Sequence, residues 1–365
     1  MSGKHPLHKK ALIMAGGTGG HVFPALAVAD LLREHDVTVH WLGTAAGIEA
    51  KVVPAADIKL HCIAVKGIRG KGKLSLLKAP WLIIKAIWQA KKVFDQVQPD
   101  VVLGMGGFAS GPGAVAAKLS GVPLIIHEQN AKAGMTNKLS LVMAKRKLAA
   151  FPAAFGSDSE KNIEVVGNPI RGAILSMQTS RERYAQRTGK LNVLIVGGSL
   201  GAMAINKVVP DTLATIDLED RPNIWHQAGI RNIDETALRY KNAQVEAQVD
   251  AFIDDMQSAY AWADLVICRA GALTVSELAI AGVAAILVPF PAAVDDHQTA
   301  NGKFLENAGA AILVQQKDLD IQKLSQLLAQ LKDRKLLSQM AAKAQQVASP
   351  KASITVANIC LKEML

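Results

Sequence analysis

Three apolar segments of the sequence each run into a glycine-rich loop and then into a helix-forming stretch. The loops are GGTGGH at 16–21, GMGGFASGPG at 104–113 and GGSLG at 197–201. A glycine turn lets backbone N–H groups approach a phosphate, and the start of the following helix carries partial positive charge. One such loop is common, but three in one chain predict a site that handles phosphate or sugar groups.

The third loop also fits a serine hydrolase. It matches G-x-S-x-G with Ser199 as the nucleophile, and Asp264 and His297 follow in the chain order of that enzyme class. A hydrolase would leave the other two loops without a role. The alternative for Ser199 is a hydroxyl that donates to a phosphate at a helix start.

The second loop matches the dinucleotide fingerprint G-x-G-x-x-A at 104–109, and Glu128 lies about 20 residues further on. The pattern arises easily by chance in a chain with 29 glycines. Glu128 also belongs to the run HEQN at 127–130, at the end of the next expected strand. NAD binding is therefore disfavoured.

A polar cluster in the second half opens a helix directly after a strand, at 269–278. Thr274 and Ser276 are expected to cap this helix, and the macrodipole favours Glu277 near its start. A carboxylate placed there can also accept hydrogen bonds from both ribose hydroxyls of a nucleotide. No metal site is expected, because Asp318 and Asp320 form a D-x-D pair that is better explained as a helix cap.

Strands and helices alternate along the chain, which predicts parallel sheets with helices on both faces. A new series of strands starts near 191, after a polar stretch at 171–190. We therefore expect an α/β fold of two Rossmann-like doubly wound domains, 1–170 and 171–347, with a C-terminal helix at about 348–365 that joins the first domain. Ligands of such sheets bind at the carboxyl ends of the strands, so the site is expected in a cleft between the domains.

The expected elements follow from the apolar runs and from the turn-forming residues that end them. Strands are predicted at 11–15, 37–42, 59–65, 100–104, 122–127, 146–150, 162–166, 192–197, 223–227, 246–253, 264–268, 284–289 and 310–314. Helices are predicted at 22–34, 112–120, 203–214, 273–281 and 321–346.

Positive charge is concentrated in the first half. Residues 1–170 carry 21 Lys and Arg against 11 Asp and Glu, whereas residues 171–365 carry 20 of each. Residues 58–94 hold nine basic side chains and no acid, and residues 129–157 hold five and no acid. Such a face suits an anionic lipid surface, a polyanionic substrate or nucleic acid. A nucleic-acid-binding protein stays an alternative that salt-dependent binding would reveal.

Taken in order, the segments GGTGGH, GMGGFASGP, HEQN, VGNPIR, GGSLGA and CRAGALTVSE resemble the MurG family of bacterial N-acetylglucosaminyltransferases. The resemblance runs from about residue 10 to about residue 350. It implies a GT-B glycosyltransferase that moves N-acetylglucosamine from UDP-N-acetylglucosamine to the C4 hydroxyl of the muramyl sugar of lipid I. Lipid II and UDP are the implied products, with inversion at the anomeric carbon, no cofactor and no obligatory metal. A UDP-sugar epimerase of the same fold is the nearest alternative.

The resemblance also implies roles for individual residues. His21 is a candidate base, with a hydrogen-bonding role at the helix start as its alternative, and Glu128 is a second candidate for base or support. At Gln298 the sequence departs from the family, which usually has Gln-Gln where this chain has His297-Gln298. The implied contacts with the donor and its nucleotide, with Asn301 close to the donor sugar, are Thr18, Gly19, Gly20, Asn130, Arg171, Ser199, Ile253, Ala272, Leu273, Thr274, Val275, Ser276, Glu277 and Gln298.

A basic and apolar segment at 66–92 predicts docking on the cytoplasmic face of the inner membrane. Tryptophan and lysine together suit a lipid headgroup boundary. Leu82, Ile83 and Ile87 are expected to pack on the domain's own sheet. The residues expected at the membrane are Lys71, Lys73, Leu77, Lys78, Trp81 and Ile84. The implied partners are thus an anionic membrane surface, the two substrates and cell-wall synthesis complexes. Nucleic acid is not among the implied partners.

Overall fold

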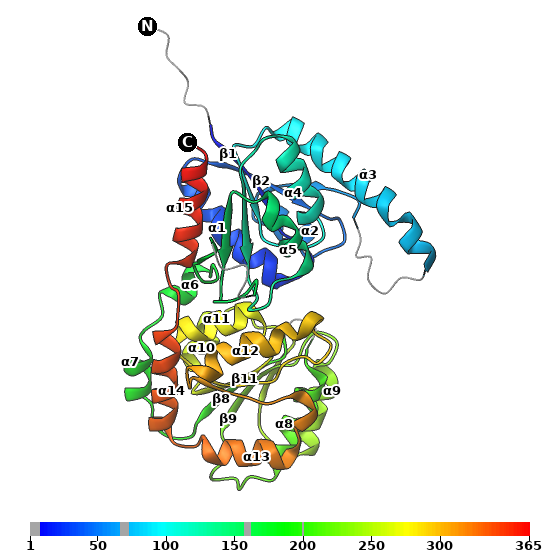
Figure 1. Ribbon diagram of the computed structural model, residues 1–365. Coiled ribbons are helices and arrows are strands. Elements are labelled where there is room, and N and C mark those ends of the chain that lie inside the picture. The colour runs from blue at the N-terminus through cyan, green and yellow to red at the C-terminus, as the bar shows by residue number, and fades with distance from the viewer. Residues whose placement is uncertain (1–7, 66–72, 157–161, 199–200) are drawn as a thin grey trace. The chain divides into compact units, whose positions relative to one another are not determined.

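The structure is a computed structural model that describes residues 8–65, 73–156, 162–198 and 201–365. The chain forms two compact units (Figure 1). One comprises Met1–Arg171 and Pro350–Leu365, and the other comprises Gly172–Ser349. Each unit has a parallel sheet of its own, which confirms the prediction of two doubly wound α/β domains.

The first domain has a seven-stranded sheet in the order β3-β2-β1-β4-β5-β6-β7. Its central strands β1, β4 and β5 are buried on both faces and are therefore mostly apolar, whereas the edge strand β7 is exposed. The strands are β1 (Lys10–Met14), β2 (Thr38–Gly43), β3 (Lys59–Cys62), β4 (Val101–Gly104), β5 (Leu124–Glu128), β6 (Arg146–Ala149) and β7 (Glu164–Val165). The helices are α1 (Gly19–Glu34), α2 (Glu49–Ala55), α3 (Lys73–Val97), α4 (Ser110–Leu119), α5 (Met135–Ser140), the 3₁₀ turn η1 (Leu141–Met143) and α15 (Ala352–Glu363).

Two cores cover the faces of this sheet. Side chains of α1, α2 and α15 share one core, and side chains of α3 and α4 share the other. The C-terminal helix α15 packs against α1, so the end of the chain belongs to the first domain (Figure 1). Ser353 anchors it there, because its hydroxyl bonds both the N–H and the carbonyl of Ile170, at 3.0 and 3.1 Å.

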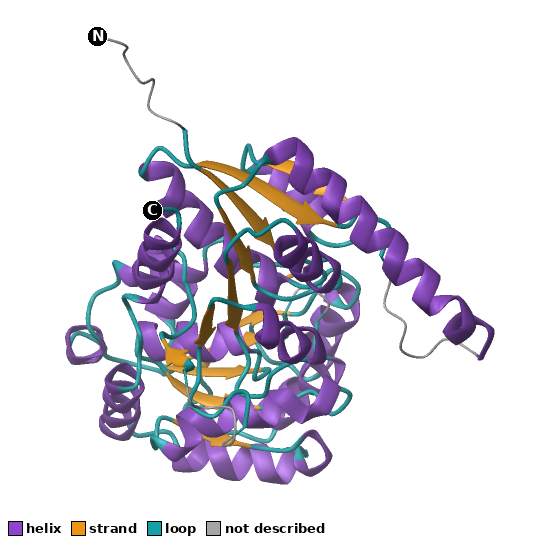
Figure 2. Cartoon of the chain, turned by 45° about the horizontal axis from the view of Figure 1, so that its top comes forward, coloured by secondary structure: helices purple, strands orange, loops and turns teal. Residues whose placement is uncertain are grey.

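The second domain has a six-stranded sheet in the order β10-β9-β8-β11-β12-β13 (strands in orange in Figure 2). The strands are β8 (Asn192–Val196), β9 (Asn223–Gln227), β10 (Gln248–Asp250), β11 (Leu265–Cys268), β12 (Ala284–Leu287) and β13 (Ala311–Leu313). The helices are α6 (Gly172–Leu175), α7 (Ser180–Ala185), α8 (Met203–Ala214), α9 (Ile233–Asn242), α10 (Met256–Trp262), α11 (Ala272–Ala281), η3 (Val294–Asp296), α12 (His297–Asn307), η4 (Gln316–Asp318), α13 (Ile321–Gln330) and α14 (Arg334–Gln346).

Two helix predictions need correction. The single helix expected at 321–346 is two helices, because Asp333 accepts a hydrogen bond from Lys335 N–H and starts α14. The N-cap of α11 is Gly271 and no side chain caps it, so Thr274 and Ser276 do not have the capping role expected of them. Asp320 does cap α13, by accepting from the N–H of Lys323.

Candidate functional site

The first two glycine loops lie against each other at the carboxyl ends of the neighbouring strands β1 and β4. A Cβ added to Gly107 would lie 2.5 Å from the carbonyl oxygen of Gly16, and Gly107 has a φ of +90°. Ser110, at the start of α4, donates to the carbonyls of Met14 and Gly106. Glycine is therefore required where the two loops touch, and the loops form one surface.

A buried carboxylate that the sequence did not single out supports the first loop. Glu49 accepts hydrogen bonds from the N–H of Gly17 at 2.9 Å and from both the N–H and the hydroxyl of Thr44. Its carboxylate fills the space where Gly16 and Gly47 have no side chains. Burial alone would raise the pKa of Glu49, but these hydrogen bonds outweigh it and hold the pKa below its usual value. The charge of Glu49 thus fixes the shape of the loop, and only contacts distant in sequence reveal this.

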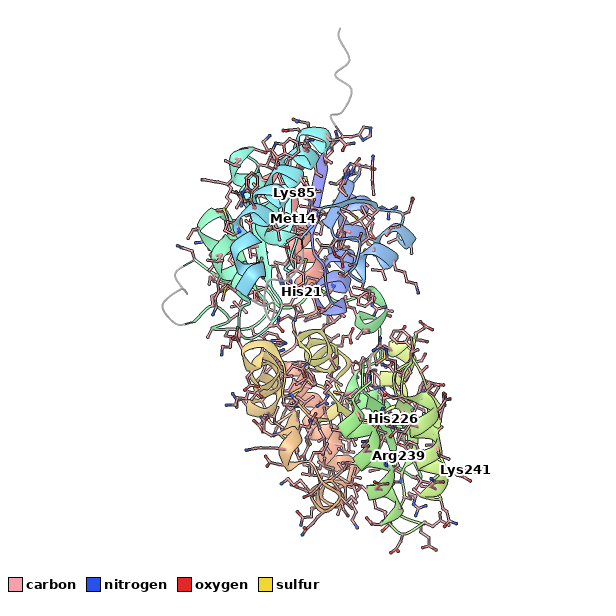
Figure 3. All side chains as sticks on the ribbon, turned by 90° about the vertical axis from the view of Figure 1, so that its right-hand side faces the viewer. Met14, His21, Lys85, His226, Arg239 and Lys241 are labelled. Atoms are coloured by element: carbon pink, nitrogen blue, oxygen red, sulfur yellow. The ribbon has the colours of Figure 1, made fainter. Side chains whose placement is uncertain are left out.

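The loop residues Thr18, Gly19 and Gly20 form the entry to α1. Thr18 is exposed and is the N-cap of the helix, although its side chain makes no cap bond. Gly19 and Gly20 are half-buried. His21 follows in the first turn (labelled in Figure 3), with its Nδ1 2.8 Å from Oε1 of Gln129. The first loop and the HEQN segment are therefore joined through His21.

Glu128 is almost fully buried, with 1% of its surface exposed. Its carboxylate accepts hydrogen bonds from the N–H and side chain of Asn130, from the N–H of Gly134 and from the side chain of Asn137, at 2.8 to 3.2 Å. A carboxylate bonded in this way holds the 128–137 segment in shape. The geometry of Glu128 therefore favours a supporting role over that of the general base. The same bonds occupy the carboxylate that the dinucleotide fingerprint would assign to the ribose.

Arg171 is exposed at the end of the first domain. Its guanidinium lies over the ring of Phe23 in α1, 4.7 Å from the ring centroid. A cation held over an aromatic face is oriented but not neutralised, so Arg171 can still meet an anion.

In the second domain the third glycine loop follows β8. Gly201 has a φ of +77°, and a Cβ there would lie 2.1 Å from the carbonyl oxygen of Ala228. Ser199 lies outside the described residues. Ile253 is buried and donates its N–H to Oε1 of Gln227 at 2.9 Å, so that N–H is already used within the chain. A backbone contact of Ile253 with uracil therefore has to use its carbonyl group.

The first two turns of α11 follow β11. Glu277 is 6% exposed, and its carboxylate accepts a hydrogen bond from the hydroxyl of Tyr260 at 3.1 Å. Leu273, Thr274 and Ser276 are half-buried, whereas Ala272 and Val275 are buried. Val275 has no exposed surface, so its side chain serves the core and cannot line a nucleotide.

Gln298 and Asn301 both have partners within the domain. Gln298 accepts from the N–H of Phe290, and Asn301 is fully buried and donates to the carbonyl of Ala270. Asn301 therefore shapes the loop before α11, and its burial disagrees with a direct contact to the donor sugar.

Arg269, which the sequence did not single out, donates to the carbonyls of Val288 and Pro289 and to Gln316. It fixes the turn that carries Phe290.

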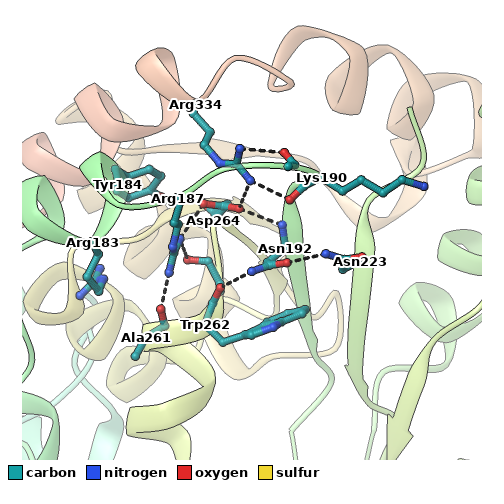
Figure 4. A network of polar contacts seen from close by, with 12 residues as sticks. Arg183, Tyr184, Arg187, Lys190, Asn192, Asn223, Ala261, Trp262, Asp264 and Arg334 are labelled. Carbon is teal, nitrogen blue, oxygen red and sulfur yellow. Dashed lines mark hydrogen bonds and ion pairs between the residues drawn. The ribbon is translucent and has the colours of Figure 1, made fainter. Parts of the chain in front are cut away.

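The serine hydrolase alternative fails on the position of Asp264. This residue lies beside Asn192 at the amino edge of the sheet, because β8 and β11 run parallel with Leu265 next to Val193. The loop at 197–201 follows the opposite edge. The carboxylate of Asp264 is fully buried and forms ion pairs with Arg187 and Arg334 (Figure 4). It is therefore a structural anion and cannot orient a catalytic histidine next to that loop.

Helix α3 carries an exposed apolar surface. Its core side consists of Ala86, Ala90 and Phe94, spaced one helical turn apart. In Figures 1 and 2 its first turns extend beyond the rest of the domain. The exposed fractions are 77% for Trp81, 52% for Leu82, 41% for Ile83, 59% for Ile84 and 60% for Trp88.

The exposure of this surface contradicts one prediction about which side chains pack on the sheet. Leu82 and Ile83 do not pack on the sheet as expected, because both are exposed and the first core side chain among the described residues 80–97 of the helix is Ala86. Ile87 is half-buried. Lys71 lies outside the described residues, and the structure places Lys73, Leu77 and Lys78 in the first turns of α3. Among the described residues, no helix combines the length and apolar character needed to cross a bilayer.

Known proteins match almost the whole length of the chain. The Glycosyltransferase family 28 N-terminal domain matches residues 11–149, and the Glycosyltransferase family 28 C-terminal domain matches residues 192–356. The UDP-N-acetylglucosamine--N-acetylmuramyl-(pentapeptide) pyrophosphoryl-undecaprenol N-acetylglucosamine transferase of Cellvibrio japonicus is 53% identical over 353 residues, which is 96% of this chain and 97% of that protein. The protein of the same name from Pseudomonas fluorescens SBW25 is 52% identical over 96% of this chain and 98% of that protein.

Solved structures agree with these relatives. The crystal structure of Acinetobacter baumannii MurG has a TM-score of 0.85 and 44% identity, and the match covers 97% of this chain and 99% of that one. UDP-GlcNAc 2-epimerase from Neisseria meningitidis matches with a TM-score of 0.65 at 14% identity, covering 97% of this chain and all of that one, which shows a shared fold alone. The fold therefore cannot separate a transferase from an epimerase, whereas the full-length relatives can.

Proposed function

Because the chain belongs to glycosyltransferase family 28, we propose that it moves N-acetylglucosamine from UDP-N-acetylglucosamine to the C4 hydroxyl of the muramyl sugar of lipid I. The products are lipid II and UDP, and the reaction serves peptidoglycan synthesis. The observation that carries the proposal is the 50–53% identity, over 96% or more of this chain, to transferases named for this donor and acceptor.

The second domain is proposed to hold the donor. Glu277 accepts from the ribose hydroxyls, the carbonyl of Ile253 meets the uracil, and the helix starts after 197–201 and at Ala272 face the diphosphate. The hydroxyl of Ser199 donates a hydrogen bond to the diphosphate. Gln298 contacts the donor sugar after its hydrogen bond with the N–H of Phe290 breaks. Support comes from those of these groups that the structure describes, because they follow the carboxyl ends of β8, β10, β11 and β12.

The first domain is proposed to hold the acceptor and the base. His21 Nε2 takes the proton of the C4 hydroxyl while that oxygen forms a bond to the anomeric carbon. The bond from the anomeric carbon to the UDP oxygen breaks on the opposite face, which inverts the configuration. The negative charge then moves onto UDP, where the helix starts of the second domain stabilise it. Thr18, Asn130 and Arg171 orient the sugars around this centre.

The test is a transfer assay with radiolabelled UDP-N-acetylglucosamine and a short-chain lipid I analogue. We expect label in a disaccharide lipid and release of UDP, both dependent on the acceptor. An epimerase would instead convert the donor without acceptor, and a hydrolase would release free sugar. Either of those outcomes in the absence of labelled lipid rejects the proposal.

Replacing Glu277 with alanine is expected to weaken donor binding by about 1–3 kcal/mol, the usual cost of deleting a charged hydrogen-bond partner. This corresponds to a roughly 5- to 150-fold higher Kd by isothermal titration calorimetry. Glu235→Ala is the control, because it removes an exposed helical glutamate that pairs with Arg239 on the same domain. An unchanged Kd in folded Glu277→Ala would remove the ribose contact from the proposal.

The exposed surface of α3 supports peripheral docking on the cytoplasmic face of the inner membrane. Trp81, Ile84 and Trp88 are apolar and exposed, and Lys85 and Lys92 are exposed among them (Lys85 in Figure 3). The ammonium of Lys92 lies 3.7 Å from the centroid of the Trp88 ring. Tryptophan beside lysine suits the headgroup region of an anionic bilayer, and a lipid-linked acceptor gives this surface a purpose.

Reversing the charge of Lys85 and Lys92 to glutamate is expected to weaken binding to anionic vesicles by about 2 kcal/mol or more, roughly 30-fold, since each basic residue near such a surface contributes about 1 kcal/mol. Co-sedimentation with anionic and neutral vesicles measures this. Lys241→Glu, at an exposed position on the second domain, is the control. Equal binding of the wild type to both vesicle types would argue against electrostatic docking.

A further inference from the structure

A continuous chain of hydrogen bonds runs from a backbone carbonyl in the first domain to His21. Nε2 of His127 lies 2.9 Å from the carbonyl oxygen of Gly167, and Nδ1 of His127 lies 3.1 Å from Nε2 of Gln129. Oε1 of Gln129 then lies 2.8 Å from Nδ1 of His21. His127 and Gln129 are buried, whereas His21 is half-buried. This series of hydrogen bonds therefore leads from the interior of the domain to the proposed base.

The direction of each hydrogen bond follows from chemistry. A carbonyl can only accept, so Nε2 of His127 carries the proton that it donates to Gly167. Burial lowers the pKa of His127 to about 4, which keeps the ring neutral and leaves Nδ1 as an acceptor. Nδ1 of His127 must then receive an N–H from the amide of Gln129, whose oxygen faces His21.

The amide of Gln129 is held in this orientation. Its nitrogen also donates to the carbonyl of His127 at 3.1 Å, so both of its N–H groups point to acceptors. Turning the amide over would place its oxygen against a ring nitrogen lone pair and a carbonyl oxygen at once. The backbone carbonyl of Gln129 accepts from the side chain of Asn168 at 3.0 Å, which fixes the segment.

His21 is held as well. A Cβ on Gly106 would lie 2.9 Å from Nδ1 of His21, so the ring packs closely against that glycine. Among the described residues, none is placed to hydrogen-bond Nε2 of His21. The free nitrogen is therefore the one on the far side of the ring from Gln129.

We propose that Gln129 is a positioning residue that fixes His21 in the Nδ1–H tautomer and so leaves the Nε2 lone pair as the proton acceptor. Which ring nitrogen of a histidine carries the proton is set by the hydrogen bond that the other nitrogen makes. Without an acceptor at Nδ1, a neutral imidazole in water favours the Nε2–H tautomer, which has no base at that position. The catalytic consequence rests on the proposed function of His21, whereas the tautomer does not.

Nitrogen-15 NMR of the full-length protein with labelled histidine tests the tautomer directly. At neutral pH we expect a protonated Nδ1 and an unprotonated Nε2 for His21, whose signals are assigned by their loss in His21→Asn. The same spectrum of Gln129→Met is expected to show the Nε2–H form. A wild-type His21 protonated on Nε2 would overturn the proposal, and this measurement does not depend on any variant at Gln129 being stable.

Kinetics tests the positioning role. Gln129→Met keeps the side-chain length and removes the amide, and it is expected to lower kcat at least about 10-fold, but by no more than loss of the base itself. The KM for the donor is expected to stay within about two-fold. Gln89→Met is the matched control, because the side-chain oxygen of Gln89 also accepts an N–H, in this case from the backbone of Ala64 in the same domain. A normal kcat in folded Gln129→Met would refute the role of Gln129, whereas a normal kcat in His21→Ala would refute the base assignment and leave the tautomer result standing.

Discussion

Replacing His21 with alanine is expected to lower kcat by about 10²–10⁴-fold, while the Kd of the donor changes by no more than about two-fold. A general base acts in the transition state, and His21 lies in the first domain, whereas the groups proposed to hold the nucleotide lie in the second. Steady-state transfer kinetics and donor titration together measure the two effects.

His35→Ala is the control for this prediction, since it removes an exposed histidine just after the same helix. Near-normal turnover of His21→Ala across pH would make His21 a structural residue. Glu128 would then be the next candidate, although its carboxylate already holds Asn130, Gly134 and Asn137.

Replacing Asp264 with asparagine is expected to destabilise the protein by about 3 kcal/mol. Removing one partner of a buried ion pair typically costs about 3–5 kcal/mol, because the remaining charge loses its partner. The low end applies here, since the side chains of Arg187 and Arg334 keep 13% and 21% of their surface exposed and can turn to water. Asp264 also accepts from the N–H of Asn192, so asparagine would disturb the start of β8 (Figure 4).

Urea unfolding followed by circular dichroism measures this loss. Asp211→Asn is the matched control, because Asp211 forms a solvent-accessible pair with Arg239 at 4.0 Å, and such pairs contribute about 1 kcal/mol or less. If Asp264→Asn costs no more than Asp211→Asn, the ion-pair network in Figure 4 does not stabilise the domain.

The sequence was sufficient to predict the strands, their alternation with helices and the positions of the glycine loops. These features depend on local patterns, namely apolar runs that end in glycines. It could not show that Glu49 supports the first loop, because that contact joins residues 32 positions apart.

The direction of individual side chains was the second feature that the sequence could not predict. The sequence did not reveal that Asn301 and Val275 point inward or that Leu82 and Ile83 stay exposed. Burial of this kind depends on which face of a helix meets the sheet and where that contact begins. Among the described side chains of α3, at 80–97, the first one in the core is Ala86, and no pattern in the neighbouring residues marks that position.

The most direct test of the proposed transfer is proton NMR of a reaction that contains UDP-N-acetylglucosamine and a short-chain lipid I analogue. Family membership and the proposed base predict that the α-linked anomeric signal of the donor is replaced by a β-linked signal on C4 of the muramyl sugar, and only when the acceptor is present. Retention of the α configuration, or consumption of the donor at the same rate without acceptor, would contradict an inverting transfer to lipid I.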